Sequence, residues 1–394
     1  MNRRYSAKKY QHQVSTAMGE STEKMSLYED LIDLSIGDPD VTTPEVIIEG
    51  AYRDALAGHT HYTDTLGDME LREEIASFYQ EEYGLSIPTS GCMITTSACH
   101  AMWLVLESVL DPMDEVIIHE PYFTPYKDQI LMAGGVPVHL ITEESEGFQI
   151  TPEKLRKALS PRTRAIILNT PNNPTGACFT KETLQLLADS AKEKNLLIIS
   201  DDVYTSFSYE EPFSPMLSFE GMEEHTITIG SFSKDFAMAG WRIGYVLAPE
   251  ELIQTMKRVN ENNVYTAPSI SQRAALHALR NRKEISSQLV PLYRERILYA
   301  FDRVMGLRGM TCLRPGGGIY LFVNIKDTGL SAEDVSERLL HEAHVLTIPG
   351  TAFGDSGEGY LRLAMTVDLK TLETAFDRIS SMDLFKTKDQ RIAL

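Results

Sequence analysis

Positive charge is scarce in this chain. Its 394 residues include 37 lysine and arginine side chains against 56 aspartate and glutamate side chains, which gives a formal net charge of −19 at pH 7. Nucleic acids and anionic membranes attract positive protein surfaces, so this deficit argues against both as partners. A local basic pocket for a small anion remains compatible with the overall charge.

Cysteine is rare, and its spacing excludes the common metal sites. Cys92, Cys99, Cys178 and Cys312 form no CxxC pair and show no zinc-type spacing with histidine. Scattered cysteines in a chain of this length are typical of reduced, packed thiols in a cytoplasmic protein. We therefore expect free thiols and no bound metal ion.

Long apolar runs and nucleotide-binding motifs are also missing. Residues 1–5 are basic, but no apolar segment typical of a signal peptide follows them, and no run is long enough to cross a bilayer. The glycines at 316–318 lack the GxGxxG spacing, and no Walker-type GK[ST] follows a glycine-rich loop. These absences predict a soluble, cytoplasmic protein with no membrane or nucleic acid partner.

The chain does contain an alternation of apolar strands and amphipathic helices. Because it exceeds the size of one ordinary core, we expect two domains. The alternation predicts an α/β fold with a mostly parallel sheet flanked by helices, since strands that are apolar throughout are covered on both faces. The expected strands of this large domain are 93–96, 115–118, 136–140, 164–168, 196–200 and 226–230, and the expected helices include 45–56, 69–83 and 180–194.

The pattern changes after Pro249. Helical patterns dominate to about Arg303, and strands at 319–324 and 360–366 then alternate with helices near 332–343 and 370–380. This predicts a smaller α+β domain, to which the first 40 residues return; residues 1–30 lack a sustained period and indicate an irregular arm. The expected division is an N-terminal arm and part of the small domain in 1–40, a large domain in 41–285 and a small domain in 286–394.

Lys234 lies just after a predicted strand, where α/β proteins build their ligand sites. The hydroxyls of Ser231 and Ser233 and the guanidinium of Arg242 form a set of donors suited to a phosphate group. A lysine beside a bound phosphate is the arrangement expected for an aldehyde cofactor that forms a Schiff base with the amine. The alternative is a solvated lysine on a turn.

Asp201 and Tyr204 follow the apolar strand at 196–200. A carboxylate beside the nitrogen of a pyridine ring keeps that nitrogen protonated, so that the ring withdraws electrons from a substrate carbon. A tyrosine hydroxyl beside the phenolic oxygen of the ring stabilises that oxyanion. The alternative is that the aspartates at this position merely end the strand and cap the segment after it.

Two further polar residues stand out. Asn173 lies in a loop, 169–176, whose two prolines and glycine present its amide on a rigid turn. Arg362 lies in an apolar strand, and a buried arginine needs a partner, for which a carboxylate bound through two hydrogen bonds fits best. A bare turn and a structural ion pair are the respective alternatives.

Taken together, these motifs resemble the class I/II aminotransferases of pyridoxal phosphate (PLP) fold type I, in the aspartate aminotransferase superfamily. Order and spacing match from Gly37 to Arg362, and the set is far more specific than any single piece. The matching elements are Asn172-Asn173-Pro174-Thr175-Gly176, Asp201 with Tyr204, Ser231-Phe232-Ser233-Lys234 with Arg242, and Arg362.

The resemblance implies a reaction and a role for each matching residue. It implies an aminotransferase that moves the amino group of an L-amino acid to a 2-oxo acid through pyridoxal 5'-phosphate in a ping-pong sequence. Lys234 would be the Schiff-base lysine and proton shuttle, and Asp201 would pair with the pyridinium nitrogen. The remaining implied roles are contact with the ring oxygen (Tyr204, Asn173), binding of the phosphate (Ser231, Ser233, Arg242) and binding of the substrate carboxylate (Arg362, Asn173, the backbone at Gly37).

Three softer matches extend the resemblance. Tyr62 resembles the tyrosine that reaches the phosphate of the neighbouring subunit, which implies a homodimer with shared active sites. Phe123 resembles the aromatic residue that stacks on the cofactor ring, with Tyr122 as the competing choice, and Ser97-Ala98-Cys99 corresponds to a loop that donates N–H groups to the phosphate at a helix N-terminus. Two positions depart from the usual pattern: many relatives have glycine at Ser97, and glutamate is frequent at Asp202.

Three other functions remain open at this stage. A C–S β-lyase or related eliminating enzyme of the same fold would use the same lysine to expel a group from the β-carbon. A penicillin-binding serine hydrolase shares the SxxK pattern of residues 231–234, but the chain has no Lys-Thr-Gly, and Ser200-Asp201 is followed by Asp202 rather than asparagine. A cofactor-binding module fused to a DNA-binding domain would need more length and more basic charge than this chain has.

Overall fold

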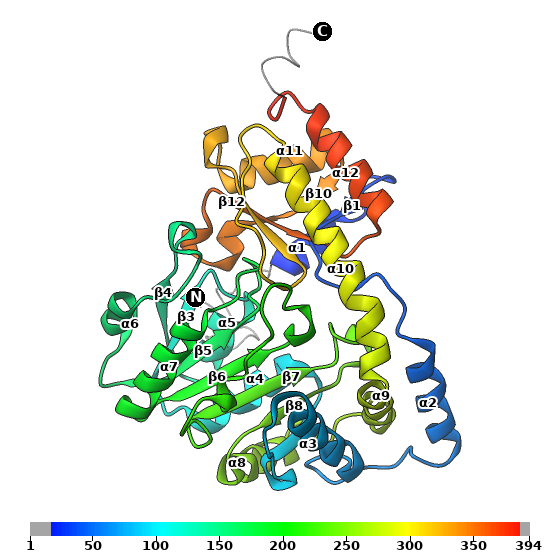
Figure 1. The fold of residues 1–394 in the computed structure, drawn as a ribbon, viewed down its shortest axis with the longest axis vertical. Helices are drawn as coiled ribbons and strands as arrows, with labels where there is room; N and C mark the ends of the chain where they lie inside the picture. The colour runs from blue at the N-terminus through cyan, green and yellow to red at the C-terminus, as the bar shows by residue number, and fades with distance from the viewer. Residues whose placement is uncertain (1–16, 387–394) are drawn as a thin grey trace, which may run out of the picture.

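The computed structural model describes residues 17–386, which form one large and two small β-sheets (Figure 1). The large sheet has seven strands in the order β2-β8-β7-β6-β5-β3-β4. Neighbouring strands from β7 to β4 are parallel, whereas β8 is antiparallel to both β7 and β2. The bounds are β2 (Cys92–Thr95), β3 (Glu115–Glu120), β4 (Val136–Ile141), β5 (Thr163–Asn169), β6 (Leu197–Asp202), β7 (Thr226–Ser231) and β8 (Gly244–Leu247).

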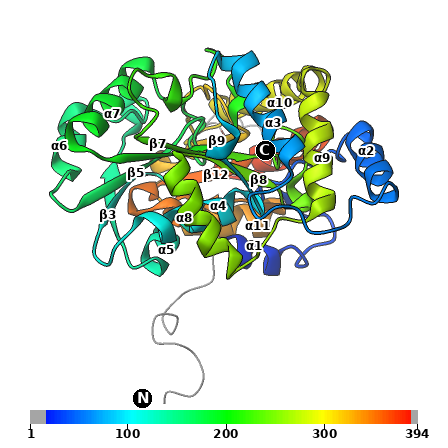
Figure 2. The same ribbon diagram turned by 90° about the horizontal axis from the view of Figure 1, so that it is seen from below.

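Helices cover both faces of this sheet. Side chains alternate along each strand, so neighbouring apolar residues of one strand are buried on opposite faces. Ile166 and Ile198 pack in one buried cluster with α6 and α7, whereas Ile167 and Ile199 pack in another with α4, α5 and α8. Figure 2 shows α7 on one side of the strands and α5 and α8 on the other. The predicted α/β fold with a mostly parallel, helix-flanked sheet is therefore confirmed. These helices are α4 (Ser97–Val109), α5 (Pro125–Met132), α6 (Pro152–Ala158), α7 (Lys181–Lys194) and α8 (Glu250–Glu261).

A long helix, α10 (Arg282–Met305), runs from the large sheet to the small sheets (Figure 1). On it, Arg296 donates through two nitrogens to the Asp40 carboxylate at 2.6 and 2.9 Å, so the helix also holds the N-terminal segment. Three more helices pack beside the large sheet: α2 (Glu45–Leu56), α3 (Met69–Tyr83) and α9 (Ser269–Arg280). Among the helices of residues 17–386, none combines the length and apolar character needed to span a bilayer.

The small sheets join the two ends of the chain. β12 lies between β11 and β9 in an antiparallel sheet, and β1 pairs in parallel with β10 through Ile32 and Val345. Residues 32–33 therefore pair with the C-terminal part of the chain. The bounds are β1 (Ile32–Asp33), β9 (Tyr320–Asn324), β10 (Val345–Leu346), β11 (Ile348–Pro349), β12 (Tyr360–Ala364), α11 (Ala332–Ala343) and α12 (Leu369–Ser381).

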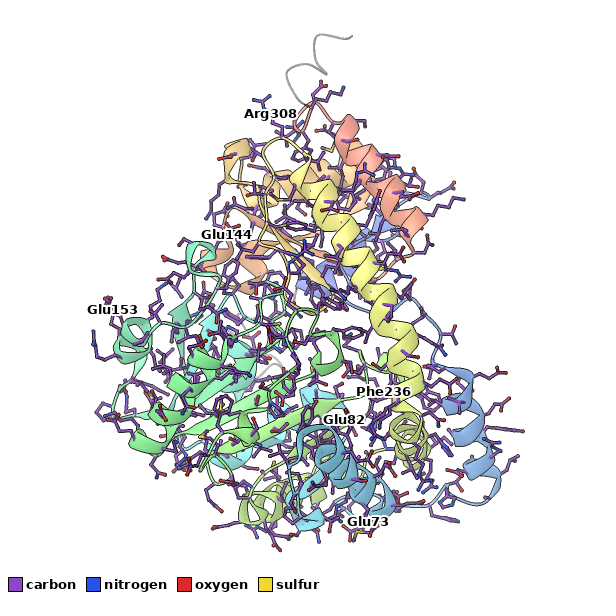
Figure 3. The ribbon with its side chains drawn as sticks, viewed as in Figure 1. Glu73, Glu82, Glu144, Glu153, Phe236 and Arg308 are labelled. Atoms are coloured by element: carbon purple, nitrogen blue, oxygen red, sulfur yellow. The ribbon has the colours of Figure 1, made fainter. Side chains whose placement is uncertain are left out.

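Glu144 connects the large sheet to the small one (Figure 3). Its Oε2 atom accepts hydrogen bonds from Asn324 Nδ2 at 2.6 Å and from the Tyr360 hydroxyl at 3.0 Å. A second connection runs from the backbone N–H of Ser356 to Glu120 Oε1 at 2.7 Å. Both contacts fix the edge of the three-stranded sheet close to the ends of β3 and β4.

The structure differs from the sequence-based expectation at several short elements. Part of the expected irregular arm forms α1 (Ala17–Lys24), where Lys24 pairs with Glu337 of α11, and the rest of that arm, residues 1–16, lies outside the described residues. The N-terminal strand β1 is only two residues long, and α6 and β8 were not expected. The division of the chain at residues 40 and 285 stays a prediction. The short 3-10 helices are Thr89–Gly91, Glu144–Glu146, Thr205–Phe207, Met216–Ser218, Ala239–Trp241, Lys326–Thr328, Gly350–Phe353 and Asp355–Gly357.

Candidate active site

A cavity of about 260 Å³ lies where strands β5, β6 and β7 end. These strands are parallel, so their carboxyl ends meet at one edge of the sheet, the usual position of ligand sites in such folds. Thirteen of the fourteen residues named from the sequence line this one cavity. They are Gly37, Ser97, Ala98, Cys99, Phe123, Asn173, Asp201, Tyr204, Ser231, Ser233, Lys234, Arg242 and Arg362.

Lys234 projects from the turn after β7 toward the N-terminal segment. Its Nζ atom donates a hydrogen bond to the backbone oxygen of Gly37, 197 residues away in the chain. Gly37 has no room for a side chain, because a Cβ atom there would lie 1.9 Å from the Tyr320 hydroxyl oxygen. Glycine at this position therefore lets the N-terminal segment come close enough to contact the lysine amine.

Asp201, at the end of β6, presents a buried carboxylate to the same cavity. Its side chain is 6% exposed, and Oδ2 accepts a hydrogen bond from the Tyr126 hydroxyl. The other oxygen, Oδ1, has no hydrogen-bond partner among the described residues. Burial raises the pKa of Asp201 to about 6, and the Tyr126 hydrogen bond opposes that rise. A cationic N–H group in the cavity would satisfy Oδ1 and offset the cost of burying the charge.

Arg362, on β12, is a buried guanidinium without a carboxylate partner among residues 17–386. Its side chain is 3% exposed and packs over the rings of Tyr320 and Phe353, 4.7 and 4.8 Å from their centroids. Its two terminal nitrogens donate to Asn173 Oδ1 at 3.0 Å and to the backbone oxygen of Ser35, and Nε has no partner among the described residues. Burial lowers the pKa of Arg362, and an incoming carboxylate would compensate for that desolvation.

Asn173 and Tyr204 are held in place by their neighbours. The backbone N–H of Asn173 donates to Asn169 Oδ1 at 2.9 Å, and Asn169 Nδ2 donates to the backbone oxygen of Asp201, also at 2.9 Å. The hydroxyl oxygen of Tyr204 lies 3.1 Å from that of Tyr320. Asn169 therefore couples the loop that carries Asn173 to the strand that carries Asp201.

The N-terminus of α4 forms another wall of the cavity, beside Ser231, Ser233 and Arg242. Ser97 has a φ of 77°, in the left-handed region that favours glycine. Gly244 packs behind this turn, where a Cβ atom would lie 2.9 Å from the Ala98 nitrogen. Amide groups at a helix N-terminus together with an arginine suit an anion such as a phosphate.

The structure separates the two aromatic candidates. Phe123 lines the cavity and packs edge-on against Tyr126, with 5.5 Å between the ring centroids. Tyr122 is not among the lining residues, and its backbone N–H donates to Phe353. Phe123 is therefore the residue that could stack on a bound ring.

Tyr62, like Tyr122, lies outside the cavity. Its side chain is 84% exposed and touches Tyr265 edge-on, with 5.4 Å between the ring centroids. Within this chain it does not line the site, so its predicted contact with a neighbouring subunit stays a prediction.

Tyr126, Asn169 and Tyr320 contact the predicted residues but received no role from the sequence. Asn169 was the most accessible of the three to sequence reasoning, because it ends a predicted strand beside the motif 172–176. Tyr126 and Tyr320 carry no comparable local signal. Among residues 17–386, no group of three or more histidine, cysteine, aspartate or glutamate side chains is placed to hold a metal ion.

The fold matches that of solved fold type I aminotransferases. The solved aspartate aminotransferase from Thermus thermophilus with maleate superimposes with a TM-score of 0.90 at 35% identity, covering 95% of this chain and 99% of that one. The aromatic aminotransferase from Pyrococcus horikoshii OT3 gives 0.87 at 36% identity, covering 91% and 97%.

Sequence comparison gives the family. The pattern of the aminotransferase class I and II family matches residues 29–379. The chain is 39% identical to an aspartate aminotransferase of Pyrococcus horikoshii over 360 residues (91% of this chain, 92% of that one) and 39% identical to aromatic-amino-acid aminotransferase 2 of Thermococcus litoralis over 359 residues (90% and 92%). The chain therefore belongs to the class I and II aminotransferases and is a transferase of amino groups, and these relatives give the β-lyase alternative no support.

Proposed function

We propose that this aminotransferase moves the amino group of an L-amino acid to a 2-oxo acid with pyridoxal 5'-phosphate as its cofactor, in two alternating half-reactions. The observation that carries the proposal is that the Lys234 amine and the unpartnered Asp201 carboxylate oxygen border one cavity. When bound, the pyridoxal ring supplies an electron sink for the bond broken at the substrate α-carbon.

The residues present fit this cofactor at each end. Asp201 Oδ1 would accept a hydrogen bond from the ring nitrogen and keep it positive, with Tyr126 fixing the other carboxylate oxygen. Phe123 would contact the ring, and Tyr204 and Asn173 would donate to its phenolic oxygen. The N-terminus of α4 (Ser97, Ala98, Cys99), Ser231, Ser233 and Arg242 would hold the phosphate.

The substrate is held by its carboxylate and handled by the lysine. The buried guanidinium of Arg362 binds the α-carboxylate, oriented by Asn173 and by the backbone at Ser35. This fixes the α-carbon where the Lys234 Nζ atom removes its proton and later returns one.

The charges of the cavity support a substrate with an uncharged side chain. Among the described residues that line it, the lysine and arginine side chains are Lys234, Arg242 and Arg362, and each already has a role. Met102, Phe123 and Val203 add apolar surface. We expect aromatic or large apolar amino acids to be better donors than aspartate, because an unpaired side-chain carboxylate would have to be desolvated there.

The arrangement also supports a homodimer in which Tyr62 reaches the neighbouring phosphate site. A tyrosine that is 84% exposed on a monomer, next to Tyr265, is typical of a residue that contacts a second subunit. All four cysteines, Cys92, Cys99, Cys178 and Cys312, are free, which supports a reducing compartment such as the cytoplasm.

Two experiments test this function. Lys234→Ala should abolish oxo-acid formation and the visible absorbance of the bound cofactor, whereas Lys370→Ala, an exposed lysine on α12, should change neither. Turnover of Lys234→Ala near the wild-type rate without added amine would overturn the assignment. A panel of amino donors with 2-oxoglutarate and pyruvate as acceptors then tests the substrate class, and a preference for aspartate over phenylalanine would overturn that part alone.

A further inference from the structure

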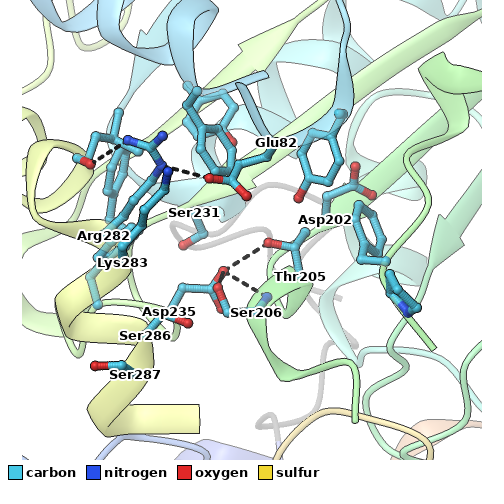
Figure 4. A pocket seen from close by; sticks show the side chains of 18 residues that line it. Glu82, Asp202, Thr205, Ser206, Ser231, Asp235, Arg282, Lys283, Ser286 and Ser287 are labelled. Atoms are coloured by element: carbon cyan, nitrogen blue, oxygen red, sulfur yellow. Dashed lines mark hydrogen bonds and ion pairs between the residues drawn. The ribbon is translucent and has the colours of Figure 1, made fainter. Parts of the chain in front are cut away.

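A second cavity lies on the opposite side of the same strand ends. Its volume is about 550 Å³, and we call it the rear cavity; its walls come from α3, α9, α10 and the segments that follow β6 and β7 (Figure 4). Figure 3 shows Glu82 and Phe236, two of its residues, beside α3 and α9. The rear cavity and the candidate active site share one lining residue, Ser231. They are therefore separate sites built on the same sheet edge.

Two aspartates face the rear cavity, each the neighbour in sequence of a proposed catalytic residue. Asp202 follows Asp201 at the end of β6, and because side chains alternate along a strand it faces the other side. Asp235 follows Lys234 in the turn after β7 and lines the rear cavity, whereas Lys234 lines the active site. Neither aspartate lines the active site, so the proposed amino-group transfer does not account for them.

Each of these aspartates has one oxygen without a partner among the described residues. The Asp235 side chain is 8% exposed; its Oδ2 accepts hydrogen bonds from the hydroxyls of Thr205 and Ser206, both at 3.0 Å (Figure 4), and its Oδ1 accepts none. The Asp202 side chain is 4% exposed; its Oδ1 accepts from the Ser200 hydroxyl at 2.5 Å, and its Oδ2 accepts none. Two buried carboxylates with free acceptor atoms at one cavity indicate a missing donor.

The cations of the cavity wall do not supply that donor. Arg282 is already paired with Glu81 at 2.5 Å and with Glu82 at 3.2 Å. Lys283 is exposed, and it forms no ion pair with another residue of the described chain. Neither Asp202 nor Asp235 has an ion pair within residues 17–386, so both carboxylates line the cavity without a cationic partner.

The remaining walls are aromatic, which narrows the class of ligand. Phe78, Tyr83, Phe213 and Phe236 line the cavity, and Tyr83 meets Phe213 edge-on with 6.0 Å between the ring centroids. Aromatic faces attract organic cations and bury apolar groups. The third carboxylate of the cavity, Glu82, is already paired with Arg282, and the described residues contain no metal-binding cluster, so a divalent metal ion fits less well than an amine.

We propose that the rear cavity is a binding site for a small primary amine with an aromatic or large apolar body, whose ammonium group is held by Asp202 and Asp235. An ammonium group donates N–H bonds only, and Asp202 and Asp235, which line the cavity, each have one oxygen without a partner to accept such a bond. The apolar body lies against Phe78, Phe213 and Phe236. A free amine and an amino acid share this chemistry; in an amino acid, Lys283 at the outer edge faces the carboxylate.

The test is a calorimetric titration of the holoenzyme after borohydride has reduced the cofactor onto Lys234, so that an added amine cannot react at the active site. We expect 2-phenylethylamine to bind saturably at one site per chain. Asp235→Asn should weaken this binding at least about tenfold, because it removes the buried charge while keeping the shape. Asp189→Asn, which changes an exposed carboxylate on α7, is the matched control and should leave the affinity unchanged.

Control ligands and a second variant complete the test. 2-Phenylethanol has the same body without the charge, so equal affinity for the alcohol would overturn the proposal, as would amine binding that Asp235→Asn does not change. If Asp235→Asn does not fold, Ser286→Phe fills the cavity from α10 and should abolish binding. L-Phenylalanine shows whether the natural ligand is an amino acid or a free amine. If it binds more tightly than 2-phenylethylamine and Lys283→Gln weakens that binding, the ligand is an amino acid; if it binds more weakly, the ligand is a free amine.

Discussion

Replacing Asp201 by asparagine tests the electrostatic basis of the proposed reaction. The buried carboxylate has one oxygen fixed by Tyr126 and one oxygen free, so its negative charge would lie about one hydrogen bond, ~3 Å, from a ring nitrogen. With an effective dielectric constant of about 20, two unit charges at that separation attract by roughly 5–6 kcal/mol. Asparagine keeps the shape and removes the charge, so the nitrogen loses its proton and the ring withdraws electrons less well. We expect kcat to fall by about 10³- to 10⁴-fold.

The assay measures oxo-acid formation at saturating cofactor, so that weaker cofactor binding is not mistaken for slower chemistry. Asp202→Asn is the matched control, because this carboxylate is equally buried on the same strand but faces the rear cavity. Its kcat should stay within about twofold of the wild-type value. If Asp201→Asn retained kcat within tenfold of the wild type, the ion pair with the ring would be refuted.

Three further predictions concern the substrate, the cofactor and stability. Arg362→Lys should lower kcat/KM about 100-fold or more, mainly through KM, because an ammonium cannot form the same pair of hydrogen bonds with a carboxylate; steady-state kinetics with an unchanged KM would contradict this. Gly244→Ala should weaken cofactor binding, measured by titration, because its Cβ atom would lie 2.9 Å from the Ala98 nitrogen at the phosphate-binding turn, whereas Gly240→Ala meets nothing within 4 Å and should bind normally. Burial raises the pKa of Asp202 to about 7 from 3.8, so the native state binds this proton more tightly than the unfolded state, and stability is lost as the pH rises between these values. Asp202→Asn should therefore reduce the loss of unfolding free energy between pH 4 and 7 by about 3 kcal/mol. Urea unfolding of the cofactor-free chain that showed the same pH dependence as the wild type would contradict this.

Local signals in the sequence were sufficient to predict the limits of two helices, α2 and α3. The expected limits of 45–56 and 69–83 match α2 and α3, and Asp68 caps α3 by accepting a hydrogen bond from the Glu70 N–H at 2.9 Å. An N-cap residue and the apolar period that follows it lie within a few residues of each other, so the sequence shows them directly. The strand ends that carry Asp201 and Lys234 were predicted for the same reason.

Elements that depend on distant partners were missed. β8 is four residues long, and it forms because β7 and β2 supply hydrogen bonds on both sides, which no local pattern reveals. The Tyr126 hydroxyl reaches Asp201 across 75 residues of sequence. α1 is short and gains its partner, Glu337, from the other end of the chain. Such contacts depend on the completed fold, and propensity alone does not determine them.

The Lys234 Nζ atom has two roles: it donates a hydrogen bond to Gly37, and in the proposed reaction it transfers a proton. Gly37 belongs to the segment that leaves β1, where Leu34 accepts a hydrogen bond from the Ala364 N–H at 2.8 Å and Ser35 accepts one from Arg362. The arginine that holds the substrate and the glycine that holds the lysine are thus parts of one bonded unit. When that nitrogen carries the cofactor or takes part in proton transfer it cannot also make this contact with Gly37, so the bonds to Ala364 and Arg362 would then hold the segment after β1.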